Sequence, residues 1–335
     1  MQIEGDRCSP CESSKRQGRG SKRRRVSTQP TREVGLMRRV PGDEFSGFVG
    51  SASGIYFIRS VYGAMRQSQP IAPPLVDAPG TDIVPGEDDR LSLVHPHSSE
   101  RLWRDHEVSS GPVSTVSFQE LIDWTGSYFA NWHPYYPFIF APDMLEYFEH
   151  ISLADLSAYE NADDLNMIML RSIMSISLAD HRQSADSRPK PYPVNLVFST
   201  YDLAVGSLRC VLAHPTSIAT LQAAVSVQLF LVSMLRLNAA SRVGGLVNRM
   251  AVQLGLHRCP ARFPSFSTRE RGTRLRLFWT IYTMDRFICQ SMGLPLGLHD
   301  DDIDVCYPRT EHHIRSTNSG TSFQIWVDAF HLTAI

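Results

Sequence analysis

The sequence predicts an all-α fold, and two observations support this prediction. Apolar residues recur at spacings of three and four, which is the pattern of one buried helix face. Gly255 and Gly293 each follow such a pattern directly, and Pro295 follows the second of them. Both residue types end helices. Long apolar helices joined by short polar turns, without alternating strands, indicate a bundle of antiparallel helices.

Charge and composition divide the 335 residues into three parts. Residues 1–39 carry eleven Lys or Arg and four Asp or Glu, whereas the whole chain has a net charge of −1. This basic end predicts an anionic partner, and a solvated tail is the alternative. Residues 40–113 contain a stretch rich in Pro, Gly, Ser and Asp, so we expect a disordered linker. Residues 114–335 contain the helical patterns and form the predicted folded domain.

Several protein classes are disfavoured by the sequence. The sequence has six cysteines, four of which are scattered through apolar segments that are predicted to be helical. This distribution does not resemble the disulfide framework of a secreted protein. No signal peptide is evident. The apolar run Ile218–Leu235 approaches the length of a membrane span, but its polar residues Gln222, Ser226 and Ser233 predict a buried core helix instead. No nucleophile elbow, P-loop or dinucleotide fingerprint is found, so we assign no catalytic residue and expect no enzyme.

The first helix of the predicted domain begins after Ser117, which forms a capping-box pattern with Glu120. It ends in a dense aromatic group with two prolines, residues 131–138. We expect this group to be a rigid corner that packs on the core, with a ligand pocket as the alternative. Further helices are predicted at Pro142–Ile151, Leu165–Asp180, Pro193–Leu212 and Thr216–Leu235.

The last two helices have the clearest patterns. The apolar positions of the first are Val243, Leu246, Val247, Met250 and Leu254, and those of the second are Leu277, Ile281, Met284 and Ile288. Gly255 fits the left-handed position after the first helix, and Leu256 can fold back onto it. Asp285 and Arg286 lie within the second apolar stripe. Because buried charges need partners, we expect Arg286 or Asp285 to pair with a charge on a neighbouring helix, for example Asp285 with Arg249.

The amino-acid sequence of these segments resembles the middle regulatory region of fungal zinc-binuclear-cluster transcription factors. The matching segments follow in the family's order: Asn238–Arg242, Arg249–Ala251, Leu254–Arg258, Leu277–Trp279, Asp285-Arg286, Gly293–Leu296 and Asp301–Asp304. Ser241 stands where that family usually has an aromatic residue. The core-motif residues that the resemblance marks are His133, Pro134, Arg249, Gly255, His257, Phe278, Trp279, Asp285 and Arg286.

The N-terminal segment resembles part of that family's zinc cluster. Cys8-Ser9-Pro10-Cys11 looks like the start of the second half of a site in which six cysteines share two zinc ions. Gly18 stands where a further cysteine is expected, and the first three cysteines would precede Met1 or are absent. Zinc is therefore expected only with a complete cluster, because Cys8 and Cys11 alone cannot close it. We expect residues 1–39 to be disordered and to lack the DNA-recognition helix.

A run of basic residues follows these cysteines: Lys15, Arg16, Arg19, Lys22, Arg23, Arg24 and Arg25. It is compatible with a nuclear import signal, with phosphate contacts that carry no sequence information, or with an inert tail. A homodimer is possible, but a coiled coil is not supported because Gly47, Gly50 and Gly54 interrupt any heptad pattern.

The resemblance implies a nuclear regulator of RNA polymerase II transcription whose helical domain responds to an inducer or a partner. Its expected partners are DNA and regulator proteins or the transcription machinery, with no membrane contact. An interaction module that does not bind DNA is the first alternative. The second is a magnesium-dependent diphosphate enzyme, suggested only by the spacing of Asp300, Asp301 and Asp304, for which a solvated turn is preferred. The chain ends within what resembles another helix, Phe330–Ile335, so we expect truncation there.

Overall fold

The computed structural model describes residues 35–39, 46–54, 56–58, 60–61, 65, 101–159, 164–183 and 190–306. Several sequence-based expectations concern residues outside these ranges. They include the cysteines of the zinc-cluster remnant, the basic run and the predicted last helix at Phe330–Ile335.

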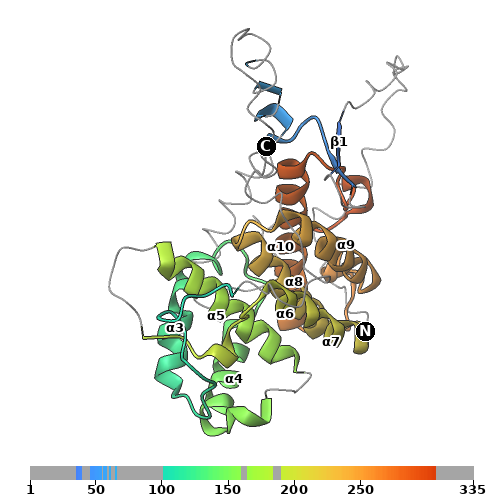
Figure 1. Ribbon diagram of the computed structural model, residues 1–335. Coiled ribbons are helices and arrows are strands. Elements are labelled where there is room, and N and C mark those ends of the chain that lie inside the picture. The colour runs from blue at the N-terminus through green and yellow to red at the C-terminus, as the bar shows by residue number, and fades with distance from the viewer. Residues whose placement is uncertain are drawn as a thin grey trace, which may run out of the picture.

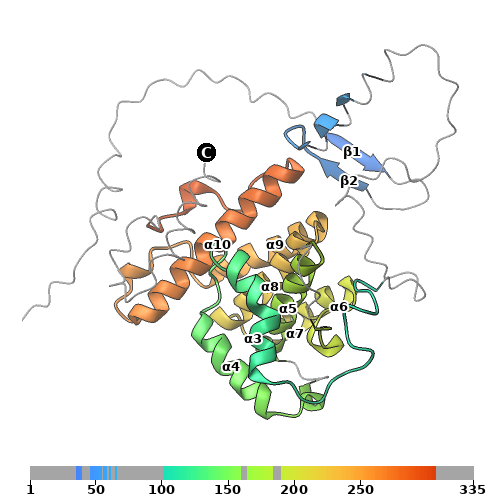
Figure 2. The same ribbon diagram turned by 90° about the vertical axis from the view of Figure 1, so that its left-hand side faces the viewer.

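The described part of the chain is an all-α domain, as predicted, with one short pair of strands before it (Figures 1 and 2). The α-helices are α3 (Phe118–Asn131), α4 (Ala141–Leu153), α5 (Leu165–Gln183), α6 (Tyr201–Gly206), α7 (Leu208–Ala213), α8 (Ile218–Ser233), α9 (Leu237–Gln253) and α10 (Thr268–Met292). Short 3-10 helices are η1 (Leu156–Tyr159), η2 (Val194–Leu196), η3 (Pro260–Arg262) and η4 (Asp300–Asp302).

Helix α8 is the centre of the core. It packs against α5 and α9 and has further contacts with α7 and α10 (Figure 2). Its polar side chains bond to backbone carbonyls: Gln222 donates to Phe138 O at 2.7 Å and Gln228 to Ala240 O at 3.3 Å. The prediction of a buried core helix for this apolar run is therefore confirmed.

The predicted helix ends agree with the structure. Ser117 Oγ accepts from the N–H of Glu120, whose carboxylate accepts from Ser117 N, so the capping box forms. Gly255 has φ +69° and Gly293 has φ +66°, the left-handed conformation in which a residue without Cβ has no steric penalty. Leu256 is buried, and its N–H donates to Ala251 O at 3.0 Å. This bond closes α9.

The prediction of one helix over Pro193–Leu212 is wrong. The chain forms η2, then a separate α6 whose first turn is capped by Thr200 Oγ1 accepting from Leu203 N, and then α7. Thr200 and Ser207 separate these elements because short hydroxyl side chains compete for backbone groups. Ser207 Oγ donates to Ala204 O at 2.6 Å at the junction of α6 and α7.

The packed unit begins before residue 114, so the linker expectation fails for residues 101–113. Trp103 is buried and its indole N–H donates to Phe198 O at 2.7 Å. Glu107 forms a hydrogen-bonded ion pair with Arg182 of α5. The hydrogen bond from Arg182 holds the pKa of the Glu107 carboxyl below its ordinary value. Apolar and charged contacts together fix this segment on the helices, which composition alone does not show.

Two strands that the sequence did not suggest lie near the end of α10 (Figure 1). β1 (Leu36–Arg39) and β2 (Ser46–Val49) pair antiparallel, with Leu36 opposite Val49. Gly50 follows β2 and its N–H donates to Met292 O at 3.2 Å. A Cβ on Gly293 would lie 2.6 Å from Gly50 O, so glycine permits this close contact of backbones. The strand pair is thereby attached to the end of α10.

Candidate functional site

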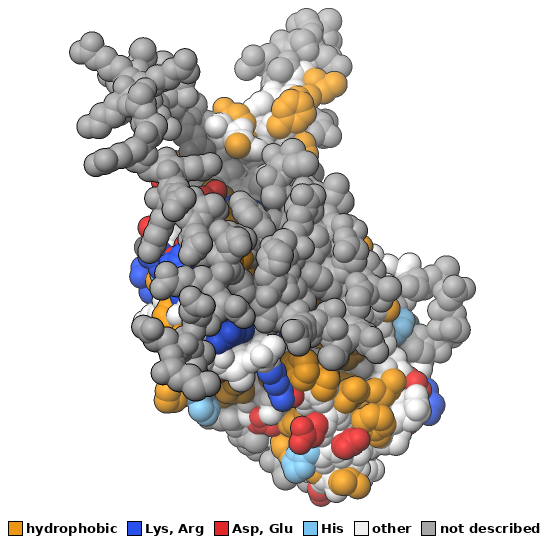
Figure 3. Space-filling model, turned by 180° about the vertical axis from the view of Figure 1, so that it is seen from behind, with side chains coloured by type: hydrophobic (Ala, Val, Ile, Leu, Met, Phe, Trp, Pro, Cys, Tyr) orange, Lys and Arg blue, Asp and Glu red, His pale blue; other side chains and the backbone are white. Residues whose placement is uncertain are grey.

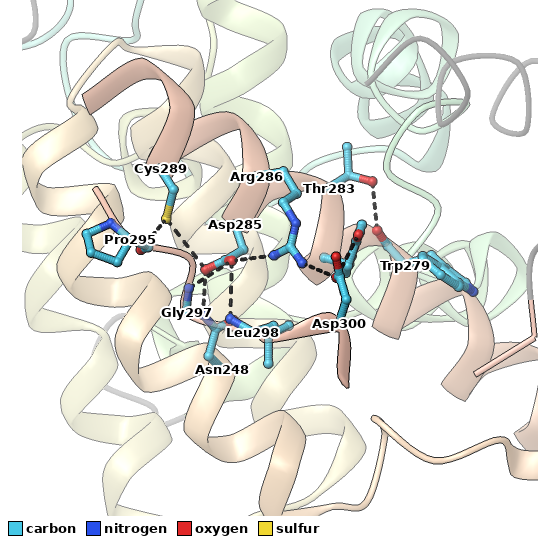
Figure 4. A network of polar contacts seen from close by, with 11 residues as sticks. Asn248, Trp279, Thr283, Asp285, Arg286, Cys289, Pro295, Gly297, Leu298 and Asp300 are labelled. Atoms are coloured by element: carbon cyan, nitrogen blue, oxygen red, sulfur yellow. Dashed lines mark hydrogen bonds and ion pairs between the residues drawn. The ribbon is translucent and has the colours of Figure 1, made fainter. Parts of the chain in front are cut away.

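The polar centre of the motif region is Asp285, a carboxylate on α10 that is 7% exposed. Its Oδ2 accepts hydrogen bonds from the backbone N–H groups of Gly297 at 3.1 Å and Leu298 at 3.3 Å. Its Oδ1 accepts from Asn248 Nδ2 of α9 at 2.7 Å (Figure 4). Since buried charges are stable only when they are well bonded, this carboxylate joins α9, α10 and residues 293–306, which we call the 293–306 loop.

Arg286 extends this network to the far part of the loop. Its Nη1 lies 3.0 Å from Asp285 Oδ2, and its Nη2 contacts Asp300 Oδ1. The guanidinium carbon lies 4.0 Å from the centroid of the Tyr282 ring, and the Tyr282 hydroxyl donates to Asp300 at 3.1 Å. Burial raises the pKa of the Tyr282 phenol, so the phenol remains a donor at neutral pH. The loop is therefore fastened to α10 at two places.

The approach of the loop depends on Gly297. A Cβ at this position would lie 2.3 Å from Asn248 Nδ2 and 2.6 Å from Asp285 Oδ1. Contacts this short do not occur between real atoms, so any larger residue would have to lift the loop from the carboxylate. The glycine thus brings its own N–H within reach of Asp285.

The predicted partner of Asp285 is corrected by the structure. Arg249 is exposed, and the residue of α9 that contacts Asp285 is its neighbour, Asn248. The physical reason is the helical period: Asn248 shares the buried face of α9 with Gly244 and Ala251. The charge that balances Asp285 comes from Arg286, the next residue on α10.

A second clamp holds the end of the loop. Asp304 Oδ1 accepts from Cys259 N at 2.8 Å, and its Oδ2 pairs with Arg262 and with Arg258. The backbone N–H of Asp304 donates to His257 O at 3.2 Å. Burial and then the neighbouring Arg258 lower the pKa of His257, so its imidazole is neutral at physiological pH. Asp304 thus ties the loop to the connection between α9 and α10.

The His133-Pro134 corner also faces α10. His133 packs against Tyr128 and Phe129, with ring centroids 6.2 and 5.5 Å away. Burial, and next the positive charge of Arg276 on α10, lower the pKa of His133 to about 4. Pro134 is buried. The aromatic group therefore packs as a corner of the core.

Phe278 and Trp279 lie on the buried face of α10. They are 0% and 3% exposed, and their rings meet edge to face with centroids 5.2 Å apart. The Trp279 indole N–H donates to Cys306 O at 3.0 Å. These two motif residues therefore build the platform on which the end of the 293–306 loop rests.

The carboxylates with the spacing of a magnesium motif serve other purposes. Asp300 contacts Arg286 and Tyr282, whereas Asp304 is bound to Arg258, Arg262 and Cys259 N. In the described ranges, no group of three or more His, Cys, Asp or Glu side chains is arranged to hold a metal ion. The geometry is that of a structural turn.

The structure brings most of the predicted motif residues into one region. Gly255, His257, Phe278, Trp279, Asp285 and Arg286 surround the joint between α9, α10 and the 293–306 loop, with His133 farther along α10. Sequence reasoning missed Asn248, Gly297 and the clamping role of Asp304. For Asn248, the sequence did contain a signal: this polar residue lies in helical phase with the apolar positions of α9 that are buried.

Comparison with known proteins identifies this region. Residues 125–331 match the family model described as the fungal specific transcription factor domain. The chain belongs to this family. Over 305 residues it is 30% identical to the probable transcription factor FUP6 of Fusarium proliferatum, covering 83% of this chain and 41% of that protein. It is also 28% identical over 196 residues to the transcriptional activator protein acu-15 of Neurospora crassa, covering 58% of this chain and 19% of that protein.

A shorter match covers 69 residues of the Saccharomyces cerevisiae protein STB5, with 36% identity, 20% of this chain and 9% of that protein. The chain spans less than half the length of these relatives. The family and the two longer matches are transcription factors, not enzymes. No solved structure matches the chain. Among the helices within the described residues, none is both long and apolar enough to cross a membrane.

Proposed function

We propose that this chain regulates the transcription of RNA polymerase II genes in the nucleus. Membership of the fungal specific transcription factor domain family carries the proposal, because the matched residues 125–331 include the whole Asp285 network. Two relatives, which match over 305 and 196 residues, are named as a probable transcription factor and a transcriptional activator. A helical domain with its motif residues gathered at one joint is suited to transmit the binding of an inducer or a partner.

A tethered reporter tests this function. The full chain is fused to an unrelated sequence-specific DNA-binding domain, and reporter messenger RNA is measured in fungal cells. We expect a several-fold change in either direction relative to the DNA-binding domain alone. Reporter RNA that stays at the control level, with the fusion present in the nucleus at equal abundance, would contradict the proposal.

The proposal includes a role for the basic N-terminal residues. The run Lys22 to Arg25 serves as a nuclear import signal and contacts phosphate groups. Zinc would be held by Cys8 and Cys11 only where four further cysteines complete the family's cluster. Elemental analysis of the purified chain decides this point. A content of two zinc ions per chain would contradict our expectation that this sequence alone does not form the cluster.

One observation favours the interaction module as a second function. The N-terminal segment after β2 exposes large apolar side chains: Phe57 is 68% exposed and Met65 is 60% exposed, with Ile58 and Val61 also exposed. Phe57, Val61 and Met65 are in helical conformation. Their spacing of four residues is that of one helix face. Figure 3 shows hydrophobic side chains at the top of the molecule, where Figure 1 places this segment. Exposed apolar groups of this kind mark protein contacts.

Affinity capture separates the two functions. A chain that acts without DNA contacts should bring down regulator proteins equally well after nuclease treatment and should not retain a promoter fragment. Recovery of specific promoter DNA by the chain alone would favour the DNA-binding regulator instead.

A further inference from the structure

Two cysteines far apart in the sequence meet at the second clamp. Cys259 follows the end of α9 and Cys306 ends the described part of the 293–306 loop, and their sulfur atoms lie 3.5 Å apart. Both side chains are in the thiol form and buried, with 0% exposure for Cys259 and 8% for Cys306. Both belong to the four cysteines that are scattered through apolar parts of the sequence.

The backbone around both residues is fixed by bonds already described. Cys259 N donates to Asp304 Oδ1, and Asp304 N donates to His257 O. The carbonyl of Cys306 accepts from the Trp279 indole. These hydrogen bonds fix the backbone of both chain segments. The folded structure itself therefore holds the two sulfur atoms close together. The separation of 3.5 Å leaves a gap of about 1.5 Å to the ~2.05 Å of a disulfide bond.

We propose that Cys259 and Cys306 are an oxidant-sensitive pair that forms a reversible disulfide and locks the 293–306 loop onto the connection between α9 and α10. The oxidant is a small peroxide. Cys306 is the more exposed of the two residues. Its sulfur attacks one peroxide oxygen, the O–O bond breaks, and a sulfenic acid and water are formed. The sulfur of Cys259 then displaces the sulfenic oxygen. In total, two thiols lose two electrons and two protons, and one hydrogen peroxide is reduced to two water molecules.

The disulfide would close a loop of the chain that includes all of α10 and every residue of the Asp285 network except Asn248, which lies on α9. Cross-linking residues this far apart restricts the unfolded chain and stabilises the folded one. Disulfides in a reducing compartment are transient and report oxidants, and a dithiol restores the open form. The proposal does not depend on the function proposed above, because the chemistry is measured on the protein itself.

Peptide mapping tests the bond directly. The purified full chain is titrated with hydrogen peroxide, remaining thiols are alkylated in denaturant, and the tryptic digest is analysed by mass spectrometry. We expect residues 259–262 to be linked through Cys306 to the peptide 287–309, with Cys289 alkylated. Recovery of Cys259 only in alkylated form, or joined to Cys289, over the whole titration would overturn the proposal.

Thermal unfolding tests the lock. Oxidation should raise Tm by roughly 5–10 °C, and dithiothreitol should reverse the rise. The variants Cys259→Ser and Cys306→Ser should lose this response, whereas Cys210→Ser, which replaces a buried thiol elsewhere, should keep it. If a clamp variant does not fold, the mapping of the unmodified chain still decides. A rise in Tm of equal size in a folded Cys306→Ser variant would overturn the lock.

Discussion

Replacement of Asp285 by alanine removes the acceptor that joins α9, α10 and the 293–306 loop. The side chain is 7% exposed. It accepts from Asn248 Nδ2 and from the N–H groups of Gly297 and Leu298. Alanine leaves these three donors in a buried site without a partner. Arg286 loses its contact with Asp285 but keeps its contact with Asp300, so its guanidinium still has a carboxylate partner.

The magnitude follows from these contacts. A buried donor left unsatisfied costs about 1–3 kcal/mol, and water that enters beside the loop recovers part of this loss. Removing one partner of a buried ion pair costs roughly 3–5 kcal/mol in comparable cases. We therefore expect the free energy of unfolding to fall by about 3–5 kcal/mol. For a helical body of this size, Tm should fall by about 8–15 °C.

Urea and thermal unfolding of the full chain, followed by circular dichroism, measure this effect. The matched control is Arg249→Ala, because Arg249 adjoins Asn248 on α9 but is exposed. Its loss should be below about 0.5 kcal/mol. An unchanged Tm for Asp285→Ala, or an equal fall for Arg249→Ala, would refute the reasoning.

Three further predictions concern single residues. Gly297→Ala should destabilise by about 1–3 kcal/mol and speed proteolysis of the 293–306 loop, because its Cβ would meet Asp285 and Asn248. Gly245→Ala, on an open face of α9, should instead stabilise by about 0.5–1 kcal/mol, and losses of equal size in both would be contrary to this view. Leu235 has φ +56°, so Leu235→Gly should stabilise by about 0.5–1 kcal/mol in urea unfolding, whereas a loss would contradict the inferred strain. Because the pKa of His133 falls from 6.5 to about 4 on folding, the unfolded chain binds more protons between these values. Stability should therefore fall by up to about 3 kcal/mol as pH drops from 6.5 towards 4, and His133→Gln should reduce that slope; an identical slope in both proteins would contradict it.

Much of the fold was accessible from the sequence because local signals decided it. The capping box at Ser117 and the glycine stops at Gly255 and Gly293 act within one helical turn, and all three agree with the structure. The apolar α8 was predicted as a core helix from the placement of its few polar residues. These features depend on neighbours in the chain.

Other features depend on contacts that composition does not encode. Residues 101–113 look like a linker until Trp103 is seen in the core, with a bond to Phe198 across 95 positions. The break between α6 and α7 was hidden because their apolar residues continue one pattern. The predicted α9 partner of Asp285 was Arg249, whereas the observed partner is the adjacent residue Asn248. The prediction relied on the attraction of opposite charges and did not consider which face of α9 each residue occupies. The meeting of Cys259 and Cys306 requires the loop to return across α10.

Rapid depletion of the chain from the fungal cells that express it, followed by sequencing of nascent RNA, tests the central claim most directly. The account predicts that a reproducible set of RNA polymerase II transcripts changes before secondary effects develop, and that the unmodified chain restores it. Nascent transcription that remains the same at every gene, under conditions in which the chain is abundant before depletion, would contradict a role in transcription regulation.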